Sequence, residues 1–296
     1  MFSVELLILG EGWTSKFLIP QLKENQISYA STSRSGHNDT LKFEFNPDSH
    51  DPTPFQILPT ASTILITFPI KNLGGSKLLV DLYLKTHPKA INKMNLAVNF
   101  VQLGSSGIFT EPGWSDRHSV YNKADSRAIA EDELLSLSQD SIRTTVLNLS
   151  GLWGGERNPR NWITRVASTK ELLISKTSLH LIHGVDVARS IIAVHRQFDK
   201  AAGSRWILTD RRVIYKRLGV HGVFPRYDWW DLANAWGDGG ADSEEVKGPQ
   251  PQWVGELMNQ NGLRALPRSP DILGKSLDSR EFWFTFGLEP VKGRVN

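Results

Sequence analysis

Residues 4–15 read Val-Glu-Leu-Leu-Ile-Leu-Gly-Glu-Gly-Trp-Thr-Ser, and this stretch decides the fold. Its apolar run, residues 6–9, ends at Gly10 and Gly12, and a helix-compatible segment follows at residues 16–24. A strand, a glycine turn and a helix in this order predict the opening βαβ unit of a dinucleotide-binding domain. Because the turn directly follows an N-terminal strand, the pattern is more specific than a pair of glycines alone.

The glycine turn also predicts how a cofactor would be held. Gly10 permits the tight turn, and Gly12 lets the backbone approach a pyrophosphate closely. Ser15 takes the third position of the G-x-G-x-x-G pattern, where it is small but not glycine. The pyrophosphate would rest on free N–H groups at the positive end of the helix dipole. We therefore expect the cofactor to contact Gly10, Gly12, Trp13, Thr14 and Ser15.

The end of the next strand indicates which cofactor is bound. Residues 27–34 end on Arg34, about 22 residues after Gly12, and residues 29–35 contain no Asp or Glu. In this architecture an acidic residue there binds the ribose 2′-hydroxyl of NAD, whereas an arginine accommodates the 2′-phosphate of NADP. The alternative is that Arg34 only faces solvent. The sequence favours NADP(H) over NAD(H), and we expect Phe68, which ends a later apolar strand, to contact the same cofactor.

Composition narrows the class of protein. The chain has 296 residues, a net charge of +3 and no cysteine, which excludes disulfides, thiolate nucleophiles and cysteine-ligated metals. Basic residues are scattered, so we expect no nucleic-acid partner. No apolar run approaches the roughly 20 residues of a membrane span, and residues 4–9 fit a core strand better than a signal peptide. We expect a cytoplasmic monomer or homodimer with a small-molecule substrate, no membrane partner and no metal site.

Short apolar runs alternate with helical segments along the chain, which predicts repeated parallel βαβ units. We expect an α/β fold: a Rossmann-type doubly wound parallel sheet with a smaller C-terminal substrate-binding portion. Residues 1–150 would form the dinucleotide-binding domain and residues 151–296 the substrate-binding portion, with some segments interleaved. The expected strands are 4–9, 27–34, 41–45, 63–68, 95–103, 141–149, 179–183 and 205–209, and the expected helices are 16–24, 77–85, 125–137, 185–197 and 271–286.

Several short motifs follow one another in order: Gly10-Glu11-Gly12, Arg34, Gly-Ser-Ser-Gly-Ile-Phe at 104–109, Ser-Arg-Ala-Ile-Ala-Glu at 126–131, Leu-Ser-Gly-Leu-Trp-Gly at 149–154 and Ile-His-Gly-Val-Asp-Val-Ala at 182–188. Together they resemble the extended or atypical short-chain dehydrogenase/reductase superfamily, the NAD(P)-dependent epimerase/dehydratase group. Each motif alone is weak, but their order over about 190 residues is specific. The resemblance is greatest to atypical members with a degenerate active site.

The resemblance implies a particular catalytic arrangement. In this superfamily a tyrosine phenol acts as general acid or base, and a lysine four residues later lowers the phenol pKa and binds the nicotinamide ribose. A strand-end serine or threonine donates a hydrogen bond to the substrate oxygen. This chain has Ser105 and Ser106 for the strand-end role.

The tyrosine–lysine pair is broken in this chain. If Tyr121 takes the tyrosine position, the lysine position holds Asp125, which would raise the phenol pKa. If Arg127 takes the lysine position, the tyrosine position holds Lys123. Lys123 and Arg127 are four residues apart and would share one helix face, where Arg127 could still bind a ribose or phosphate.

We expect an NADP(H)-dependent oxidoreductase that acts on a carbonyl or hydroxyl group of a small molecule. Its substrate cleft would combine the loop after Ser106, residues 151–165 and the tryptophan-rich residues 220–252, which would alternatively pack as core or lid. The broken pair leaves two alternatives open: a non-catalytic NADP(H)-binding sensor or regulatory protein, and a redox-neutral isomerase or lyase. We expect Ser106 or Ser105 to polarise the substrate oxygen and Lys123 or Arg127 to hold the ribose. Tyr121 is the first candidate for the proton donor, and Lys123, Tyr215 and His183 are the alternatives.

Overall fold

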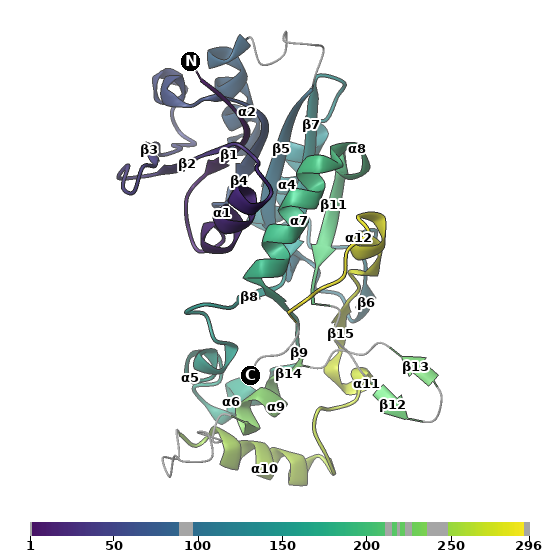
Figure 1. The fold of residues 1–296 in the computed structure, drawn as a ribbon. Coiled ribbons are helices and arrows are strands. Elements are labelled where there is room, and N and C mark those ends of the chain that lie inside the picture. Colours follow the sequence, from purple (N-terminus) through teal and green to yellow (C-terminus); the bar gives the residue numbers. More distant parts are fainter. Residues whose placement is uncertain are drawn as a thin grey trace.

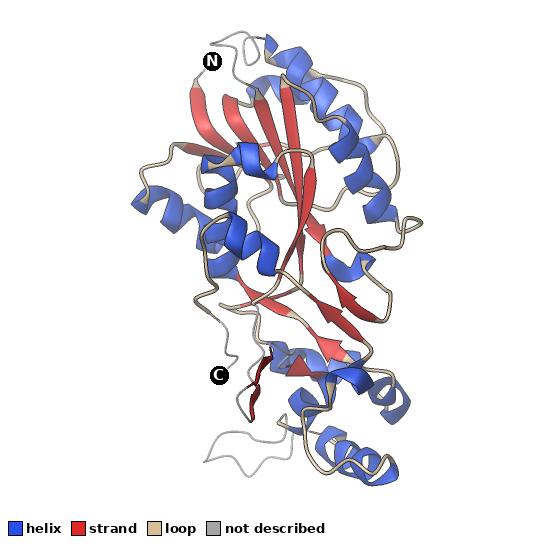
Figure 2. Cartoon of the chain, turned by 90° about the vertical axis from the view of Figure 1, so that its right-hand side faces the viewer, coloured by secondary structure: helices blue, strands red, loops and turns tan. Residues whose placement is uncertain are grey.

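A seven-stranded parallel sheet forms the centre of the protein, with helices on both of its faces (Figures 1 and 2). The computed structural model describes residues 2–88, 97–210, 215–217, 220–222, 227–235 and 248–292. The strand order and the parallel pairing confirm the expected Rossmann-type α/β fold. In spatial order the strands are β11 (Ser204–Leu208), β7 (Ile142–Leu149), β5 (Val98–Ser105), β4 (Thr60–Ile66), β1 (Ser3–Leu9), β2 (Tyr29–Ser33) and β3 (Leu41–Lys42).

Both faces of the sheet are buried, and β1 shows why its sequence is a continuous apolar run. Leu6 and Ile8 point into one hydrophobic cluster, whereas Leu7 and Leu9 point into the other, as the two-residue period of a strand requires. The first cluster lies under α1 (Ser15–Glu24), α7 (Gly184–Arg196), α8 (Phe198–Ala201) and α12 (Arg280–Thr285). The second lies under α2 (Gly75–Thr86) and α4 (Ser126–Ser136).

The strand order places a topological switch point at the middle of the sheet. The chain moves from β1 outward to β2 and β3 on one side, and then crosses back to β4, on the other side of β1, from which it continues outward to β5 and β7. Loops at the carboxyl ends of strands on either side of such a point run in opposite directions and leave a crevice for a ligand. The segments after β1, β2, β4 and β5 therefore border the crevice in which a ligand would bind.

Residues beyond 150 build a smaller layer below the sheet in Figure 1 and also return to the sheet through α7 and β11. A third hydrophobic cluster lies there and includes Trp230, whose Nε1 donates to the Leu173 carbonyl. The division of the chain near residue 150 stays a prediction. The elements of this layer are η3 (Pro159–Trp162), α5 (Ile163–Val166), α6 (Lys170–Ile174), α9 (Trp229–Asn234), α10 (Gln250–Gln260) and the strand pairs β8 (Gly151–Trp153) with β10 (Leu181–His183) and β9 (Ser178–Leu179) with β14 (Tyr227–Asp228).

The structure differs from the sequence interpretation in the C-terminal segment. Instead of one helix over 271–286, it has α11 (Pro270–Leu273), β15 (Lys275–Leu277) and α12, because Gly274 takes a φ of +74° that ends the first helix. β15 pairs with β6 (Gly113–Ser115). The remaining elements are η1 (Thr53–Ile57), η2 (Ser106–Ile108) and the pair β12 (Tyr215–Arg217) with β13 (Val220–Gly222).

The tryptophan-rich segment lies partly outside the described residues, which leave out 223–226 and 236–247. Its described tryptophans, Trp229 and Trp230, pack in the third hydrophobic cluster together with Trp253. Among the residues the structure describes, no helix is both long and apolar enough to cross a membrane.

Candidate cofactor-binding and catalytic site

The first glycine of the turn is required by the backbone itself. Gly10 has a φ of +94°, and a Cβ atom there would lie 2.7 Å from Thr67 Oγ1. Two neighbouring strand ends fix the turn: Gly10 N donates to Thr32 Oγ1 at 3.0 Å, and Thr67 Oγ1 donates to the Gly10 carbonyl at 2.6 Å. Contacts within the protein itself therefore fix the conformation of the turn.

The second glycine faces open space. A Cβ atom at Gly12 would meet no atom of the described chain within 4 Å. Helix α1 begins at Ser15 with Thr14 as its N-cap residue, and the N–H groups of Gly12, Trp13 and Thr14 form no hydrogen bond within the described ranges. Open space beside three free donors at a helix start suits a pyrophosphate.

The third position of the pattern is packed rather than open. Ser15 is 1% exposed, and its hydroxyl has no hydrogen-bond partner in the part of the chain that is described. A side chain this enclosed must be small, which accounts for serine where the pattern usually has glycine. The backbone of Ser15, not its hydroxyl, belongs to the helix start that would face a phosphate.

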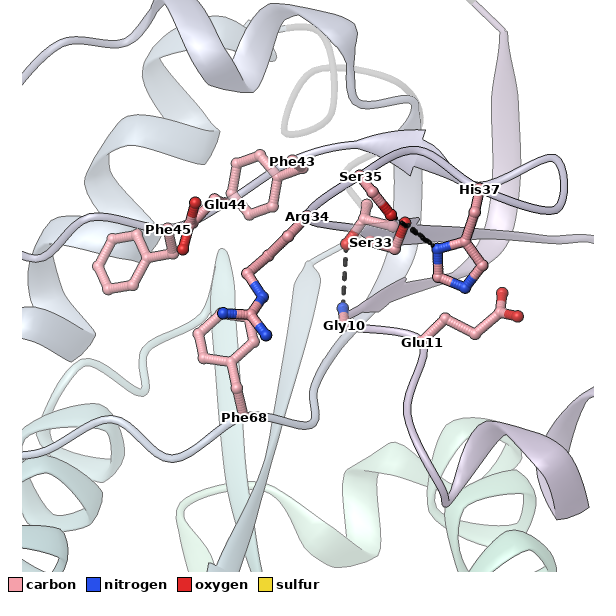
Figure 3. Close-up of a pocket in the computed structure, with 11 residues that line it drawn as sticks. Gly10, Glu11, Ser33, Arg34, Ser35, His37, Phe43, Glu44, Phe45 and Phe68 are labelled. Carbon is pink, nitrogen blue, oxygen red and sulfur yellow. Dashed lines mark hydrogen bonds between the residues drawn. The ribbon is translucent and has the colours of Figure 1, made fainter.

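A pocket of about 530 Å³ opens beside the glycine turn, between the ends of β1, β2 and β4 (Figure 3). Arg34 is exposed and extends toward the ring of Phe68, which stacks on Phe45 with 6.1 Å between the ring centroids. Flat aromatic rings beside a guanidinium suit an adenosine whose ribose carries a phosphate. The lining residues are Gly10, Glu11, Thr32, Ser33, Arg34, Ser35, His37, Phe43, Glu44, Phe45 and Phe68.

The loop between β2 and β3 is short and internally hydrogen-bonded. Ser33 Oγ accepts from Gly36 N at 2.9 Å and lies 2.6 Å from Thr40 Oγ1, while His37 Nδ1 lies 3.1 Å from Ser33 Oγ. Ser35 Oγ also approaches His37 Nδ1, at 2.9 Å. Of this loop only Arg34 was predicted to bind the cofactor, and the polar run at 32–37 is the sequence signal for the other lining residues.

Glu11 is a second residue that the sequence analysis missed. It stands between the two glycines, lines the same pocket as Arg34, and its carboxylate accepts a hydrogen bond from Ser31 Oγ. The pocket is thus lined by two carboxylates, those of Glu11 and Glu44, as well as by the Arg34 guanidinium, so its charge is mixed. Glu11 follows the end of β1, whereas the residue that distinguishes NAD from NADP was expected at the end of β2.

Trp13 points away from this pocket. Its side chain is 8% exposed, its Nε1 donates to the Gly154 carbonyl at 3.2 Å, and its ring meets Phe17 edge to face at 4.9 Å. Trp13 was expected to contact the cofactor. Its indole N–H is already used within the protein, so its backbone N–H is the donor that it can offer.

On the other side of the switch point, Ser105 ends β5 and is held at three atoms. Its N donates to Glu131 Oε1 at 3.2 Å, its carbonyl accepts from Asn148 Nδ2 at 3.2 Å, and its Oγ accepts from Gly107 N at 3.1 Å. The hydroxyl proton of Ser105 takes no part in these bonds. Ser106 is 7% exposed and begins the short helix η2.

Glu131 joins the end of β5 to a buried polar network. Its Oε2 accepts from Asn148 Nδ2 at 2.7 Å and from Arg205 Nη1 at 3.0 Å, and only 3% of Glu131 is exposed. Burial raises the pKa of the Glu131 carboxyl, while Asn148 and the Arg205 charge oppose that rise. The network fixes where Ser105 lies.

Tyr121 is turned toward helix α4. Its hydroxyl donates to Asp132 Oδ1 at 2.8 Å, and the Arg205 guanidinium lies 4.2 Å from the centroid of its ring. Burial and the hydrogen bond to Asp132 raise the pKa of the Tyr121 phenol. The phenol is thus engaged with a carboxylate of the protein.

Lys123 and Arg127 do not form the pair that four-residue spacing suggested. Lys123 is exposed and precedes α4, whose N-cap residue is Asp125. Arg127 is half-buried, and its Nη2 donates to the Leu103 carbonyl at 3.3 Å. Because the helix begins only at Ser126, the rule for neighbours on one helix face does not apply to Lys123.

No family model and no curated protein sequence matches this chain. Solved structures do match it over nearly its whole length. A short-chain dehydrogenase/reductase superfamily protein from Agrobacterium tumefaciens with bound NAD is 11% identical, with a TM-score of 0.59 over 98% of this chain and 93% of its own. The UDP-N-acetylglucosamine 4-epimerase from Bacillus cereus is 10% identical, with a TM-score of 0.57 over 98% and 95%.

The yeast methylglyoxal/isovaleraldehyde reductase complexed with NADPH is 15% identical, with a TM-score of 0.53 over 98% of this chain and 94% of its own. The chain therefore has the fold of the extended short-chain dehydrogenases/reductases and NAD-dependent epimerases. This confirms, for the fold, the resemblance drawn from the ordered motifs. At sequence identities this low, structural similarity establishes the fold but not the chemistry, which depends on this chain's own residues.

Proposed function

We propose that this protein binds NADP(H) and uses it for oxidoreduction of a carbonyl or hydroxyl group on a small molecule. One observation carries the proposal: an open helix start at Gly12 and an aromatic pocket with Arg34 adjoin at the switch point of a Rossmann-type sheet. The first fits a pyrophosphate and the second fits a phosphorylated adenosine.

Different residues would bind different parts of the cofactor. The N–H groups of Gly12, Trp13 and Thr14 would hold the pyrophosphate, Phe45 and Phe68 would contact the adenine ring, and Arg34 would pair with the 2′-phosphate. The nicotinamide end would then extend toward the carboxyl ends of β4 and β5.

Ser105 is the residue placed to act on a substrate there. A bound nicotinamide supplies or accepts a hydride at its C4 atom. Ser105 Oγ accepts the Gly107 N–H, and its own proton meets no acceptor among the described residues, so it can donate a hydrogen bond to a carbonyl oxygen. That bond would strengthen as negative charge develops on the oxygen, which stabilises the transition state.

The proton donor expected from the sequence, Tyr121, is held by the protein itself. Its phenol would have to leave Asp132 before the proton could reach a substrate oxygen, so we assign Tyr121 no large share of the rate. The same hydrogen bond favours a second candidate function, an NADP(H)-binding sensor or regulatory protein without turnover.

The two candidates are separated by an activity screen. Purified protein with NADPH would be tested against a panel of aldehydes and ketones, and loss of NADPH absorbance would be followed. We expect turnover that falls about 100-fold or more in Ser105→Ala, because an oxyanion-type donor contributes about that much. Tight NADPH binding without turnover on any substrate would favour the sensor.

A further inference from the structure

A tight turn from the C-terminal half of the chain lies against the start of α1. Its ends are closed by two backbone hydrogen bonds, Gly154 N to the Arg157 carbonyl at 2.8 Å and Arg157 N to the Gly154 carbonyl at 3.1 Å. The Gly154 carbonyl also accepts the indole N–H of Trp13 at 3.2 Å. This turn, residues 154–157, is thereby joined to the residue that follows Gly12.

The turn is held in place by packing and by charge. A Cβ atom at Gly154 would lie 2.3 Å from His183 Nε2, so the backbone lies directly on that ring. The His183 ring in turn contacts Phe17 at 5.4 Å and Trp153 at 4.6 Å between centroids. Lys16 Nζ and Glu156 Oε1 form a salt bridge of 2.7 Å from α1 to the turn.

Arg157 is the charged residue of this turn that keeps its hydrogen-bond donors free. Its side chain is exposed, and its guanidinium carbon lies 4.5 Å from the centroid of the Trp13 ring. No carboxylate in the described ranges forms a salt bridge with it, and the neighbouring Glu156 pairs with Lys16. A guanidinium that stacks on an indole is oriented by the stacking but leaves its planar N–H edges available.

We propose that Arg157 binds the pyrophosphate of the dinucleotide from the side opposite the glycine turn. The inference rests on the proposed function and deepens it. The ring on which Arg157 stacks belongs to Trp13, whose backbone N–H is one of the three free donors of the helix start. Arginine offers two parallel N–H donors to phosphate oxygens. Arg157 would therefore bind the side of the pyrophosphate that the backbone N–H groups of the helix start leave open.

The test compares four variants by titration with three ligands. The variants are Arg157→Ala, Arg157→Lys, Arg34→Ala and, as a matched control, Arg165→Ala, which removes an exposed arginine from α5. The ligands are NADPH, NADH and adenosine 2′-monophosphate, which has the 2′-phosphate but no pyrophosphate. Thermal midpoints of the free proteins show whether each variant is folded.

Arg157→Ala should weaken NADPH and NADH equally, by about tenfold or more, since a charge-assisted pair to phosphate is lost. Its affinity for adenosine 2′-monophosphate should stay within about twofold of wild type, which a general structural defect would not allow. Arg157→Lys should lose less affinity for the two dinucleotides than Arg157→Ala, because lysine keeps the positive charge although it lacks the planar donors. Arg165→Ala should match wild type with all three ligands.

Arg34→Ala should show the complementary pattern, weakening NADPH and adenosine 2′-monophosphate but not NADH. If Arg157→Ala binds both dinucleotides like wild type, the Arg157 proposal is wrong while the cofactor assignment stands. If adenosine 2′-monophosphate weakens as much as NADPH in Arg157→Ala, the residue has a structural role and the proposal is also wrong. Wild-type protein that binds none of the ligands would overturn both proposals.

Discussion

The hydroxyl of Tyr121 donates a hydrogen bond to Asp132 Oδ1 at 2.8 Å. Burial and this carboxylate raise the phenol pKa, whereas the tyrosine of the superfamily needs a pKa lowered by a neighbouring lysine. Ser105, by contrast, is held at three atoms, and within the described part of the chain its hydroxyl proton has no acceptor. The two residues expected in one catalytic site therefore differ: the Tyr121 hydroxyl already donates its proton within the protein, whereas the Ser105 hydroxyl can donate to a substrate.

We predict that this difference appears in mutant kinetics. Once a substrate is found, Ser105→Ala should lower kcat about 100-fold or more, because a donor to the developing oxyanion is lost. Tyr121→Phe should lower it less than about tenfold, because the phenol is bound to Asp132. A folded Tyr121→Phe protein without turnover would show that the phenol leaves Asp132 and is the proton donor.

Arg34 should decide between the two nicotinamide cofactors. Arg34→Ala should weaken NADPH binding about 10- to 100-fold, the range expected for a charge-assisted bond, and leave NADH binding nearly unchanged. The NADPH affinity of Arg34→Lys should lie between those of wild type and Arg34→Ala. The measurement is calorimetric titration of each variant with each cofactor, and equal losses for both cofactors would mean that Arg34 does not meet the 2′-phosphate.

Glu11 should oppose the binding of a 2′-phosphate in the same pocket. Glu11→Gln should raise NADPH affinity by about threefold to tenfold, because it removes a negative charge near the phosphate without changing size. Ser31→Ala should lower NADPH affinity, since it frees the carboxylate from Ser31 Oγ. Competition titrations against NADH provide the comparison. Weaker NADH binding in Glu11→Gln would show instead that Glu11 accepts from the ribose 2′-hydroxyl.

Substitutions at the two glycines of the turn should have different effects, one on the stability of the fold and the other on cofactor binding. Gly10→Ala should destabilise the fold by about 1–3 kcal/mol, because φ is +94° and the new Cβ would lie 2.7 Å from Thr67 Oγ1. Gly12→Val should fold normally, since no described atom lies within 4 Å of a Cβ there, but it should lose cofactor binding. Chemical denaturation and cofactor titration of both variants separate the two effects. Normal NADPH binding in Gly12→Val would show that the pyrophosphate does not approach Gly12.

His180 should make the fold sensitive to acid. Burial lowers the pKa of its imidazole to about 4, and the Lys275 charge acts in the same direction. Between pH 6.5 and about 4 the unfolded chain therefore binds a proton that the folded protein does not, so stability falls as pH falls through this window. The full difference corresponds to about 3 kcal/mol.

His180→Gln should reduce the slope of unfolding free energy against pH by nearly one proton at pH ~5. Urea denaturation across this pH range measures the slope, and His50→Gln, at an exposed histidine, is the control. Equal slopes in wild type and His180→Gln would mean that His180 is protonated in the folded state as well.

Local sequence patterns predicted the sheet well because its strands are short apolar runs bounded by glycine or polar residues. The run before Gly10 became β1, and both of its faces are buried as its sequence indicated. The C-terminal segment was less predictable. There, the φ of +74° at Gly274 and the pairing of β15 with β6 override a pattern that looked helical.

The candidate site was predictable only where one segment determines it. Gly10, Gly12 and Arg34 follow from a single strand–turn–helix pattern and the strand after it. Glu11, Glu131 and Arg157 matter through partners 20 or more residues away, namely Ser31, Arg205 and Trp13. Such pairings arise from tertiary packing, which spacing rules along one element do not reveal.

The central claim is best tested by titrating the wild-type protein with NADPH and NADH while following tryptophan fluorescence. Trp13 lies next to the expected pyrophosphate site, so a bound dinucleotide should quench its emission. We predict saturable quenching by both cofactors, with NADPH bound at least about tenfold more tightly than NADH. The absence of saturable quenching and of any calorimetric binding signal with either cofactor would contradict the account.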